Sequence, residues 1–233
     1  VNIPIALFFE HPTIAGLAQE MTRSGPAEQP ALPLKPAGKE GAGPLSFAQQ
    51  RLWFIDQLMP GCPLYNIPAI FHIEGMLDTA ILERCLNEIV QRHQALRTTF
   101  AQVNGQPTQI IASSQPVKLL LIDLRPLSPE ERELQARQLM RDQAGQPFNL
   151  ALGPLLRAML VQLDDQMYQL MLTIHHIVAD GWSMGVIMNE IGALYTAYTD
   201  DLPSPLPELA VQYADFAHWQ HQCLSDNLSQ HLD

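Results

Sequence analysis

Positive charge and cysteine are both scarce in this chain. Its 233 residues include 13 lysines and arginines against 24 acidic residues, which leaves a formal charge of −11. Affinity for nucleic acid depends mainly on cations that displace phosphate counterions, so nucleic acid is not an expected partner. The three cysteines, Cys62, Cys85 and Cys223, are odd in number and widely spaced, which fits neither a disulfide framework nor a metal-ligand pattern. Reduced thiols in a cytoplasmic protein are therefore predicted.

Long apolar runs are missing as well. No stretch of about 18 apolar residues occurs, and no basic flank precedes the first apolar residues. We therefore predict neither a membrane span nor a secretory signal, and no membrane partner. Hydrophobic residues make up 47% of the chain and charged residues 16%, which is the usual mixture of a folded globular protein.

Proline, glycine and alanine are concentrated in one part of the chain. They account for 13 of the 23 residues from Thr22 to Pro44, where no apolar periodicity survives. A segment of this composition is predicted to be an extended linker, with a boundary near Pro44. The residues before it, 1–21, are too few to enclose a core of their own.

Capping residues predict where most of the helices begin. Ser46 precedes a helical segment that extends through Gln57, and Asp78 precedes apolar residues at three-to-four spacing. Ser128 is followed by a proline and two glutamates, which predicts a helix that ends near Gly145. Two more helices are expected: one capped by Ser183 with an apolar stripe from Met184 to Tyr198, and one from Tyr213 to Leu224.

Apolar runs with turn residues between them predict the strands. Asn104-Gly105 tolerates the two positive φ angles of a tight turn, so residues 97–111 should form a hairpin. Further strands are expected at residues 64–73, 117–123, 155–163 and 167–174, the last two as a second hairpin. Helices and strands alternate irregularly, and the hairpins are antiparallel. We therefore predict the α/β (α+β) class, with helices that flank a mixed β-sheet.

Two adjacent histidines, His175 and His176, end the last of these strands. Neighbouring strand residues point to opposite faces, so one histidine should face the core and the other a cavity. The same geometry makes them poor partners on one metal ion, and no further ligand is suitably spaced, so no metal site is predicted. From the residues alone, a structural pair and a catalytic pair both remain open.

An aspartate and a glycine follow the histidine pair at Asp180 and Gly181. The carboxylate can orient an imidazole or pair with an arginine to hold the loop, and both possibilities remain open. Gly181 allows backbone conformations that are closed to other residues, and it allows a substrate to approach closely. No G-x-S-x-G motif occurs, and the cysteines lack an activating context. A catalytic histidine here would therefore act on a nucleophile that belongs to the substrate.

The segment His175-His176-x-x-x-Asp180-Gly181-Trp182-Ser183 resembles the active-site motif of the condensation domains of nonribosomal peptide synthetases. These domains belong to the chloramphenicol acetyltransferase-like superfamily. Other segments resemble further motifs of the family, in the expected order: Ser46–Trp53, Tyr65–Pro68, Arg92–Phe100, Pro147–Arg157 and Tyr213–Gln220. Asn149 departs from the family pattern, which usually has aspartate there. The resemblance spans residues 45–220, and it implies the fold of an amino-terminal lobe of that superfamily.

The resemblance also implies a division of the chain into parts. Residues 7–18 resemble the last helix of a peptidyl carrier domain, without the serine that bears phosphopantetheine in that family. The family's condensation domains are considerably longer than this chain and have a second lobe. The implied parts are a carrier-domain helix remnant (1–21), a linker (22–43), an amino-terminal condensation lobe (44–200) and the start of the segment leading to a missing carboxy-terminal lobe (201–233). This fragment alone should be inactive.

The activity implied by the resemblance is the formation of an amide bond during the synthesis of antibiotics and other secondary metabolites. The α-amine of an acceptor aminoacyl thioester attacks a donor thioester, and both are tethered to phosphopantetheine arms of partner carriers. The chain itself should bind no cofactor. The implied partners are the upstream and downstream peptidyl carrier domains, an adjacent adenylation domain and the missing lobe.

The resemblance assigns roles to six residues. His176 should face the tunnel as the catalytic residue, and the backbone amide of Gly181 is a candidate oxyanion donor. Four residues should support the site: His175, Asp180, Arg92 and Arg97. In the family, the carboxylate of Asp180 would form an ion pair with Arg97 or Arg92. A buried pair of this kind would cost about 3–5 kcal/mol when one partner is removed.

Three other functions remain open. An epimerization domain shares the histidine motif but usually lacks tryptophan directly after its glycine, so Trp182 favours condensation. A noncatalytic docking module of the same fold would be expected to have degraded motifs, whereas the motif here is intact. A free-standing acyltransferase that uses coenzyme A is disfavoured by the carrier-like start of the chain.

Overall fold

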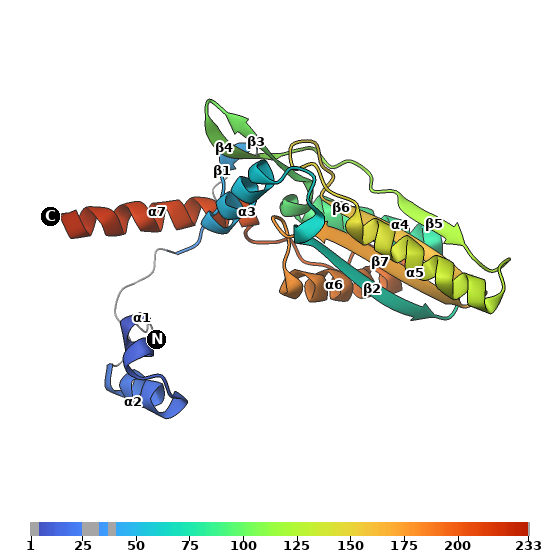
Figure 1. Ribbon diagram of the computed structural model, residues 1–233, viewed down its shortest axis with the longest axis horizontal. Coiled ribbons are helices and arrows are strands. Elements are labelled where there is room, and N and C mark those ends of the chain that lie inside the picture. The colour runs from blue at the N-terminus through green and yellow to red at the C-terminus, as the bar shows by residue number, and fades with distance from the viewer. Residues whose placement is uncertain (1–4, 25–32, 37–40, 233) are drawn as a thin grey trace. The chain divides into compact units, whose positions relative to one another are not determined.

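The computed structural model describes residues 5–24, 33–36 and 41–232 (Figure 1). The chain divides into two compact units, residues 1–33 and residues 34–233. The first unit contains α1 (Ile5–Glu10) and α2 (Ile14–Ser24), which contact each other. α2 ends inside the expected linker of residues 22–43, much of which lies outside the described residues.

The second unit is built around a four-stranded sheet in the order β2-β7-β6-β5. Its strands are β2 (Asn66–Glu74), β5 (Leu119–Asp123), β6 (Leu156–Asp164) and β7 (Met167–His175). β7 pairs antiparallel with β2 and β6, whereas β5 pairs parallel with β6, so the sheet is mixed. The predicted α/β class, with a mixed sheet flanked by helices, is thereby confirmed.

The hairpin predicted around Asn104-Gly105 forms, but it belongs to a second sheet. The three strands of this sheet are β1 (Ala42–Pro44), β3 (Thr98–Val103) and β4 (Gln106–Ile111), with β4 in the centre. Asn104 and Gly105 have φ angles of 51° and 80°, which are the left-handed values that this turn requires. The turn depends on the local sequence. The pairing of the hairpin with β1 depends on long-range packing.

Helices cover both faces of the four-stranded sheet (Figure 1). α4 (Thr79–Arg92) and α6 (Gly181–Thr199) pack on one face, and α5 (Pro129–Gly145) packs on the other. Alternation along β7 serves both cores, since Leu170 and Leu172 face α4 and α6 while Met171 faces α5. Each such buried side chain stabilises the fold by about 1.5–3 kcal/mol. The strand that ends at the histidine pair is therefore held rigidly.

Three of the predicted caps begin helices as expected. Ser46 caps α3 (Phe47–Leu58), Asp78 caps α4 and Ser128 caps α5, in each case through a side-chain oxygen. The prediction that Ser183 caps the next helix is wrong, because α6 begins at Gly181 and its cap is Asp180.

The remaining elements are η1 (Pro63–Tyr65), η2 (Gln94–Arg97) and α7 (Tyr213–Leu232), which is longer than expected. Within the described residues, no helix is both long and apolar enough to cross a bilayer.

The end of β7 is fixed from two sides. The N–H of His176 donates to the carbonyl of Tyr65, the last residue of η1 directly before β2, at 2.8 Å. On the other side, the side-chain amide of Gln49 on α3 donates to the carbonyl of Ile177 at 3.3 Å. The backbone around the two histidines is therefore held between the sheet and α3.

Candidate active site

The two neighbouring histidines lie in opposite environments, as the alternation of a strand predicts. The side chain of His175 is 4% exposed and lies among buried residues, whereas His176 is exposed. The imidazole of His176 makes no hydrogen bond within the described part of the chain, so it is available to a substrate.

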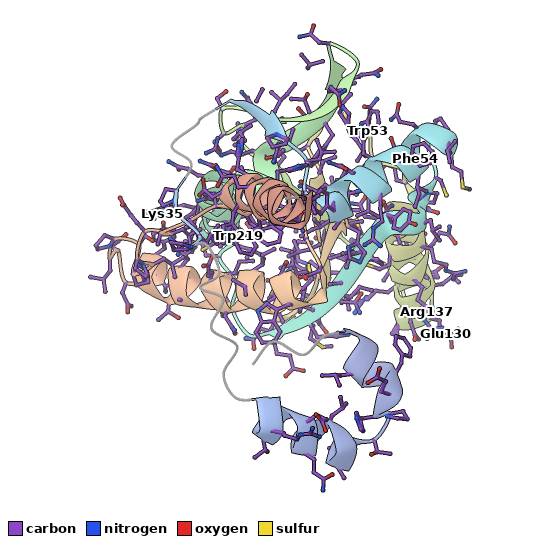
Figure 2. All side chains as sticks on the ribbon, turned by 90° about the vertical axis from the view of Figure 1, so that its left-hand side faces the viewer. Lys35, Trp53, Phe54, Glu130, Arg137 and Trp219 are labelled. Carbon is purple, nitrogen blue, oxygen red and sulfur yellow. The ribbon has the colours of Figure 1, made fainter. Side chains whose placement is uncertain are left out.

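His176 lines a cavity of about 480 Å³. One wall of this cavity is α3, the helix that also carries the labelled Trp53 and Phe54 in Figure 2. The other walls are the loop from His176 to Asp180, the start of α6 and single residues of η1 and α7. We call this space the His176 cavity, and its lining residues are Ala48, Arg51, Leu52, Ile55, Tyr65, His176, Ile177, Val178, Ala179, Asp180, Ser183 and Tyr213.

His175 is held as a neutral ring beneath this cavity. Its Nδ1 accepts a hydrogen bond from the N–H of Ile177 at 3.1 Å, so that nitrogen carries no proton. Burial lowers the pKa of His175 to about 4, and the charge of the neighbouring His176 acts in the same direction. The rings of Phe148 and Tyr65 lie beside it, with centroids 6.1 and 6.3 Å away. His175 is thus suited to shaping the loop and not to proton transfer near neutral pH.

Arg157 anchors the loop that contains Pro147 and Phe148. Its guanidinium stacks on the ring of Phe148 at 3.8 Å from the centroid and donates to the carbonyl of Pro147 at 3.1 Å. Asn149, which replaces the usual aspartate, accepts from the N–H of Ala151 through its side-chain oxygen at 3.0 Å. An aspartate oxygen would make the same contact, so the departure preserves this turn.

Asp180 uses its carboxylate to begin α6. One carboxylate oxygen accepts from the N–H of Ser183 at 2.8 Å and from its hydroxyl at 2.6 Å. These hydrogen bonds hold the pKa of the Asp180 carboxyl below its ordinary value. A short polar side chain at this position satisfies amides that the first turn of a helix leaves unpaired.

The ion pair expected between Asp180 and Arg97 or Arg92 does not form. Arg92 instead pairs with Glu190 on α6, with Nε 3.1 Å from a carboxylate oxygen, and the other oxygen of Glu190 lies 2.7 Å from Nε2 of His93. Arg97 donates to the backbone carbonyl of Ala112. The expectation is wrong because the carboxylate of Asp180 is occupied by its own helix, while a nearer acid binds Arg92.

Gly181 is the first residue of α6 and has no left-handed φ angle. The additional backbone conformations that glycine allows are therefore not used at this position. A Cβ added here would meet no atom within 4 Å, so the surrounding space is open. Gly181 is not among the residues that line the His176 cavity, although its N–H lies at the amino-terminal end of a 19-residue helix.

The cap at Asp180 leads to a testable prediction about stability. Replacing Asp180 with alanine should lower the free energy of unfolding by about 1 kcal/mol, the usual cost of a lost cap, instead of the larger cost of breaking a buried ion pair. Asp180→Asn, the matched control, keeps a capping oxygen and should be nearly neutral. Urea unfolding of the intact domain measures both. A loss above about 3 kcal/mol for Asp180→Ala would instead favour a buried charge pair.

Among the lining residues that were not predicted as site residues, three are charged or aromatic: Arg51, Tyr65 and Tyr213. A signal for Arg51 was present, because Ala48, Arg51, Leu52 and Ile55 follow the spacing of one helix face. The phenol of Tyr213 lies 3.0 Å from the hydroxyl of Ser46 and so joins α7 to the cap of α3. That contact joins residues 167 positions apart, which no local pattern indicates.

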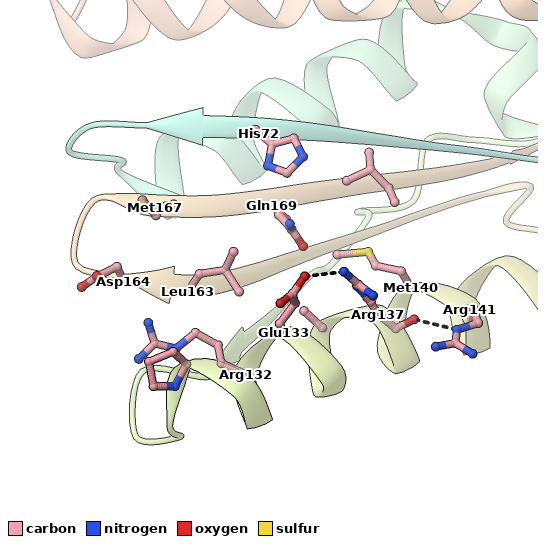
Figure 3. Close-up of a pocket in the computed structure, with 13 residues that line it drawn as sticks. His72, Arg132, Glu133, Arg137, Met140, Arg141, Leu163, Asp164, Met167 and Gln169 are labelled. Atoms are coloured by element: carbon pink, nitrogen blue, oxygen red, sulfur yellow. Dashed lines mark hydrogen bonds and ion pairs between the residues drawn. The ribbon is translucent and has the colours of Figure 1, made fainter.

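A second cavity, of about 550 Å³, lies between α5 and the opposite end of the sheet (Figure 3). It is lined by His72, Gln169 and several arginines of α5, and Arg137 pairs there with Glu133. None of the predicted site residues lies in it. The described part of the chain contains no group of three or more side chains that could hold a metal ion. The His176 cavity is therefore the candidate active site.

A family model described as the condensation domain matches residues 39–232. The chain belongs to the condensation-domain family. It is 44% identical over 228 residues to one of the linear gramicidin synthase proteins of Brevibacillus parabrevis, an alignment that covers 96% of this chain and 3% of the relative. It is 42% identical over 203 residues to phosphinothricin tripeptide synthetase PhsC of Streptomyces viridochromogenes, with 87% and 19% covered. The condensation-domain chain thus spans only a small part of these curated relatives.

Solved structures show the same fold. The starter condensation domain of the rhizomide synthetase RzmA aligns with a TM-score of 0.71 at 25% identity, over 78% of this chain and 43% of that one. The first condensation domain of the CDA synthetase aligns with a TM-score of 0.66 at 27% identity, over 71% and 42%. The resemblance to the condensation domains of nonribosomal peptide synthetases is therefore confirmed, and this chain spans less than half of these solved chains.

Proposed function

We propose that this chain forms part of an enzyme that joins two carrier-bound acyl groups through an amide bond. The observation that carries the proposal is the exposed imidazole of His176, which lines a cavity at the rigid end of β7 in a member of the condensation-domain family. The names of the relatives, a gramicidin synthase and a tripeptide synthetase, agree with a peptide product.

The proposed reaction exchanges one bond for another. The α-amine of the acceptor attacks the carbonyl carbon of the donor thioester, so that an N–C bond forms and the C–S bond breaks. The proton that the nitrogen loses passes to the imidazole of His176 and then to the departing sulfur. An α-amine has a pKa near 8 and is partly neutral at pH 7, so His176 acts by positioning the amine as well as by accepting its proton.

We propose a supporting role for the amino-terminal end of α6. The first amides of a helix have no partner inside it, and the helix dipole adds partial positive charge there. The N–H of Gly181 is our candidate donor to the oxygen that becomes negative when the amine attacks. Because Gly181 is not a lining residue of the cavity as it stands, the substrate would have to reach it through the open space beside it.

The remaining predicted residues are proposed to hold the site in place. His175 shapes the loop through its bond to Ile177, and Asp180 fixes the start of α6. Arg92 binds α4 to α6 through Glu190. Arg97 ties the end of η2 to the segment after β4. The first two contacts act directly on the loop that carries His176, and the two arginines hold the elements around it.

The organisation of the whole protein is also a proposal. We assign residues 1–21 to the end of a peptidyl carrier domain, 22–43 to a linker, 44–200 to the amino-terminal lobe and 201–233 to the segment that leads to a second lobe. The solved relatives are more than twice as long as the part that aligns, which supports a further lobe. Trp182, which is 84% exposed at the start of α6, would become covered by it.

The partners follow from this assignment. An upstream and a downstream peptidyl carrier domain would present the substrates on phosphopantetheine arms, and an adenylation domain would load the acceptor. The chain would bind no cofactor of its own and would act in the cytoplasm. Without its second lobe the fragment should be inactive, because one wall of the reaction chamber would be missing.

The proposal is tested with the complete synthetase in which this chain is followed by the rest of its condensation domain. Its donor and acceptor carriers are loaded with different aminoacyl groups, and the acceptor carrier is analysed by mass spectrometry. A dipeptidyl group on the acceptor carrier is the expected result. Inversion of the donor without transfer would indicate an epimerization domain, and the absence of both reactions would indicate a noncatalytic docking module.

A further inference from the structure

One arginine differs from all the others. Nine of the ten arginines make a hydrogen bond, an ion pair or a ring contact within the described residues: Arg23, Arg84, Arg92, Arg97, Arg125, Arg132, Arg137, Arg141 and Arg157. Arg51 makes none in that part of the chain. In a chain with 24 acidic residues, a guanidinium without a partner calls for an explanation.

Arg51 lines the same cavity as His176. The other titratable groups that face this cavity are Tyr65 from η1, Asp180 from the loop before α6, and Tyr213 from α7. The carboxylate of Asp180 accepts two hydrogen bonds from Ser183, which hold its pKa below the ordinary value, so it is an anion in the same cavity. Arg51 therefore supplies the positive charge that opposes the carboxylate of Asp180 in the space where the proposed reaction takes place.

We propose that Arg51 keeps the acceptor α-amine unprotonated when that amine lies beside His176. This inference rests on the proposed function and identifies a residue that tunes its nucleophile. A protonated amine has no lone pair and cannot attack a thioester. A fixed cation in the same cavity disfavours the ammonium form, because like charges repel. Charges act over about 8 Å at physiological ionic strength, a distance comparable with the size of this cavity.

The expected effect depends on pH. An α-amine has a pKa near 8, so most of it is protonated at pH 6.5 and little of it at pH 9.5. A decrease of about 0.7 in the pKa of the bound amine would raise its neutral fraction about fivefold at low pH. At high pH the amine is neutral with or without Arg51, so no advantage should remain.

The test measures single-turnover amide formation between pH 6.5 and 9.5 in the complete synthetase with loaded carriers. Arg51→Gln should be about fivefold slower than wild type at pH 6.5 and equal to it at pH 9.5. Arg51→Lys keeps the charge and should restore most of the rate at low pH. Arg137→Gln, the same substitution in the groove of Figure 3, should behave like wild type at every pH.

A second measurement separates charge from shape. An acceptor with a strongly electron-withdrawing side chain, whose amine is already neutral at pH 6.5, should react equally with wild type and Arg51→Gln. Arg51 is exposed and unpartnered within the described residues, so the variants should keep the wild-type melting temperature. Arg51→Met provides a second uncharged variant should the glutamine variant fold poorly.

Three results would overturn the inference. They are a rate deficit of Arg51→Gln that is the same at pH 6.5 and 9.5, wild-type rates at every pH, and no recovery with Arg51→Lys. If wild type itself forms no amide at any pH, the proposed function is wrong, which is a different outcome from a failure at Arg51 alone.

Discussion

Replacing His176 with alanine should leave the domain folded and slow amide formation by about 10²–10⁴-fold, the usual contribution of one acid–base group. The side chain is exposed and makes no hydrogen bond within the described residues, so its removal creates no buried cavity or unpaired group. A change of more than about 0.5 kcal/mol in the free energy of unfolding is therefore not expected. Single-turnover transfer between loaded carriers measures the rate, and urea unfolding measures the stability.

The matched control for this prediction is His72→Ala. His72 is also an exposed histidine, but it lies on β2 in the groove of Figure 3, away from the His176 cavity. This variant should retain wild-type activity. A His176→Ala enzyme that transfers at the wild-type rate would show that the imidazole takes no part in the chemistry. A variant that loses activity together with its fold would show that His176 is structural.

Stability should decrease more steeply in acid for wild type than for a variant that lacks His175. Burial lowers the pKa of His175 to about 4, against about 6.5 for an unperturbed histidine. Below pH 6.5 the unfolded chain therefore binds a proton at this residue that the folded chain does not bind. The resulting stability is fully present above pH 6.5 and is lost as the pH falls towards 4. Its total is at most about 3 kcal/mol.

The variant that isolates this effect is His175→Asn. Its side-chain oxygen can take the place of Nδ1 and accept the N–H of Ile177, which His175 accepts at 3.1 Å, but it cannot be protonated in this range. The free energy of unfolding, measured at pH 7 and at pH 4.5, should fall less for the variant than for wild type. His72→Asn serves as the control and should keep the wild-type slope. Parallel curves for wild type and His175→Asn would mean that the buried ring is not held neutral.

The two histidines are neighbours in the chain, but His176 is expected to affect activity and His175 to affect stability. That separation could be predicted from the sequence, because alternation along a strand places successive side chains on opposite faces. Which of the two faces the cavity could not be derived from periodicity. It depends on Phe148, whose ring lies beside His175 and is itself stacked by Arg157, and on α3, which lines the cavity together with His176.

Three helix caps could be predicted from the local sequence, and a fourth could not. Ser46, Asp78 and Ser128 were predictable as caps because each is a favoured capping residue placed just before its helical pattern. Asp180 and Ser183 are both suitable and lie three residues apart. In the structure each accepts from the backbone N–H of the other, so that Asp180 caps the helix and Ser183 belongs to its first turn. A propensity for capping alone does not distinguish the two.

Elements with local causes could be predicted from the order of the residues. These include the caps, the Asn104-Gly105 turn, the alternating strands and the ordered motifs that identify a condensation domain. The pairing of charged side chains, in contrast, depends on the folded arrangement of the helices and strands. Arg92 binds Glu190, which lies 98 positions away, instead of Asp180. Arg51 lines the His176 cavity and has no partner within the described residues. Such pairings depend on how helices pack on a sheet, and a linear pattern does not contain the distances that electrostatic energy requires.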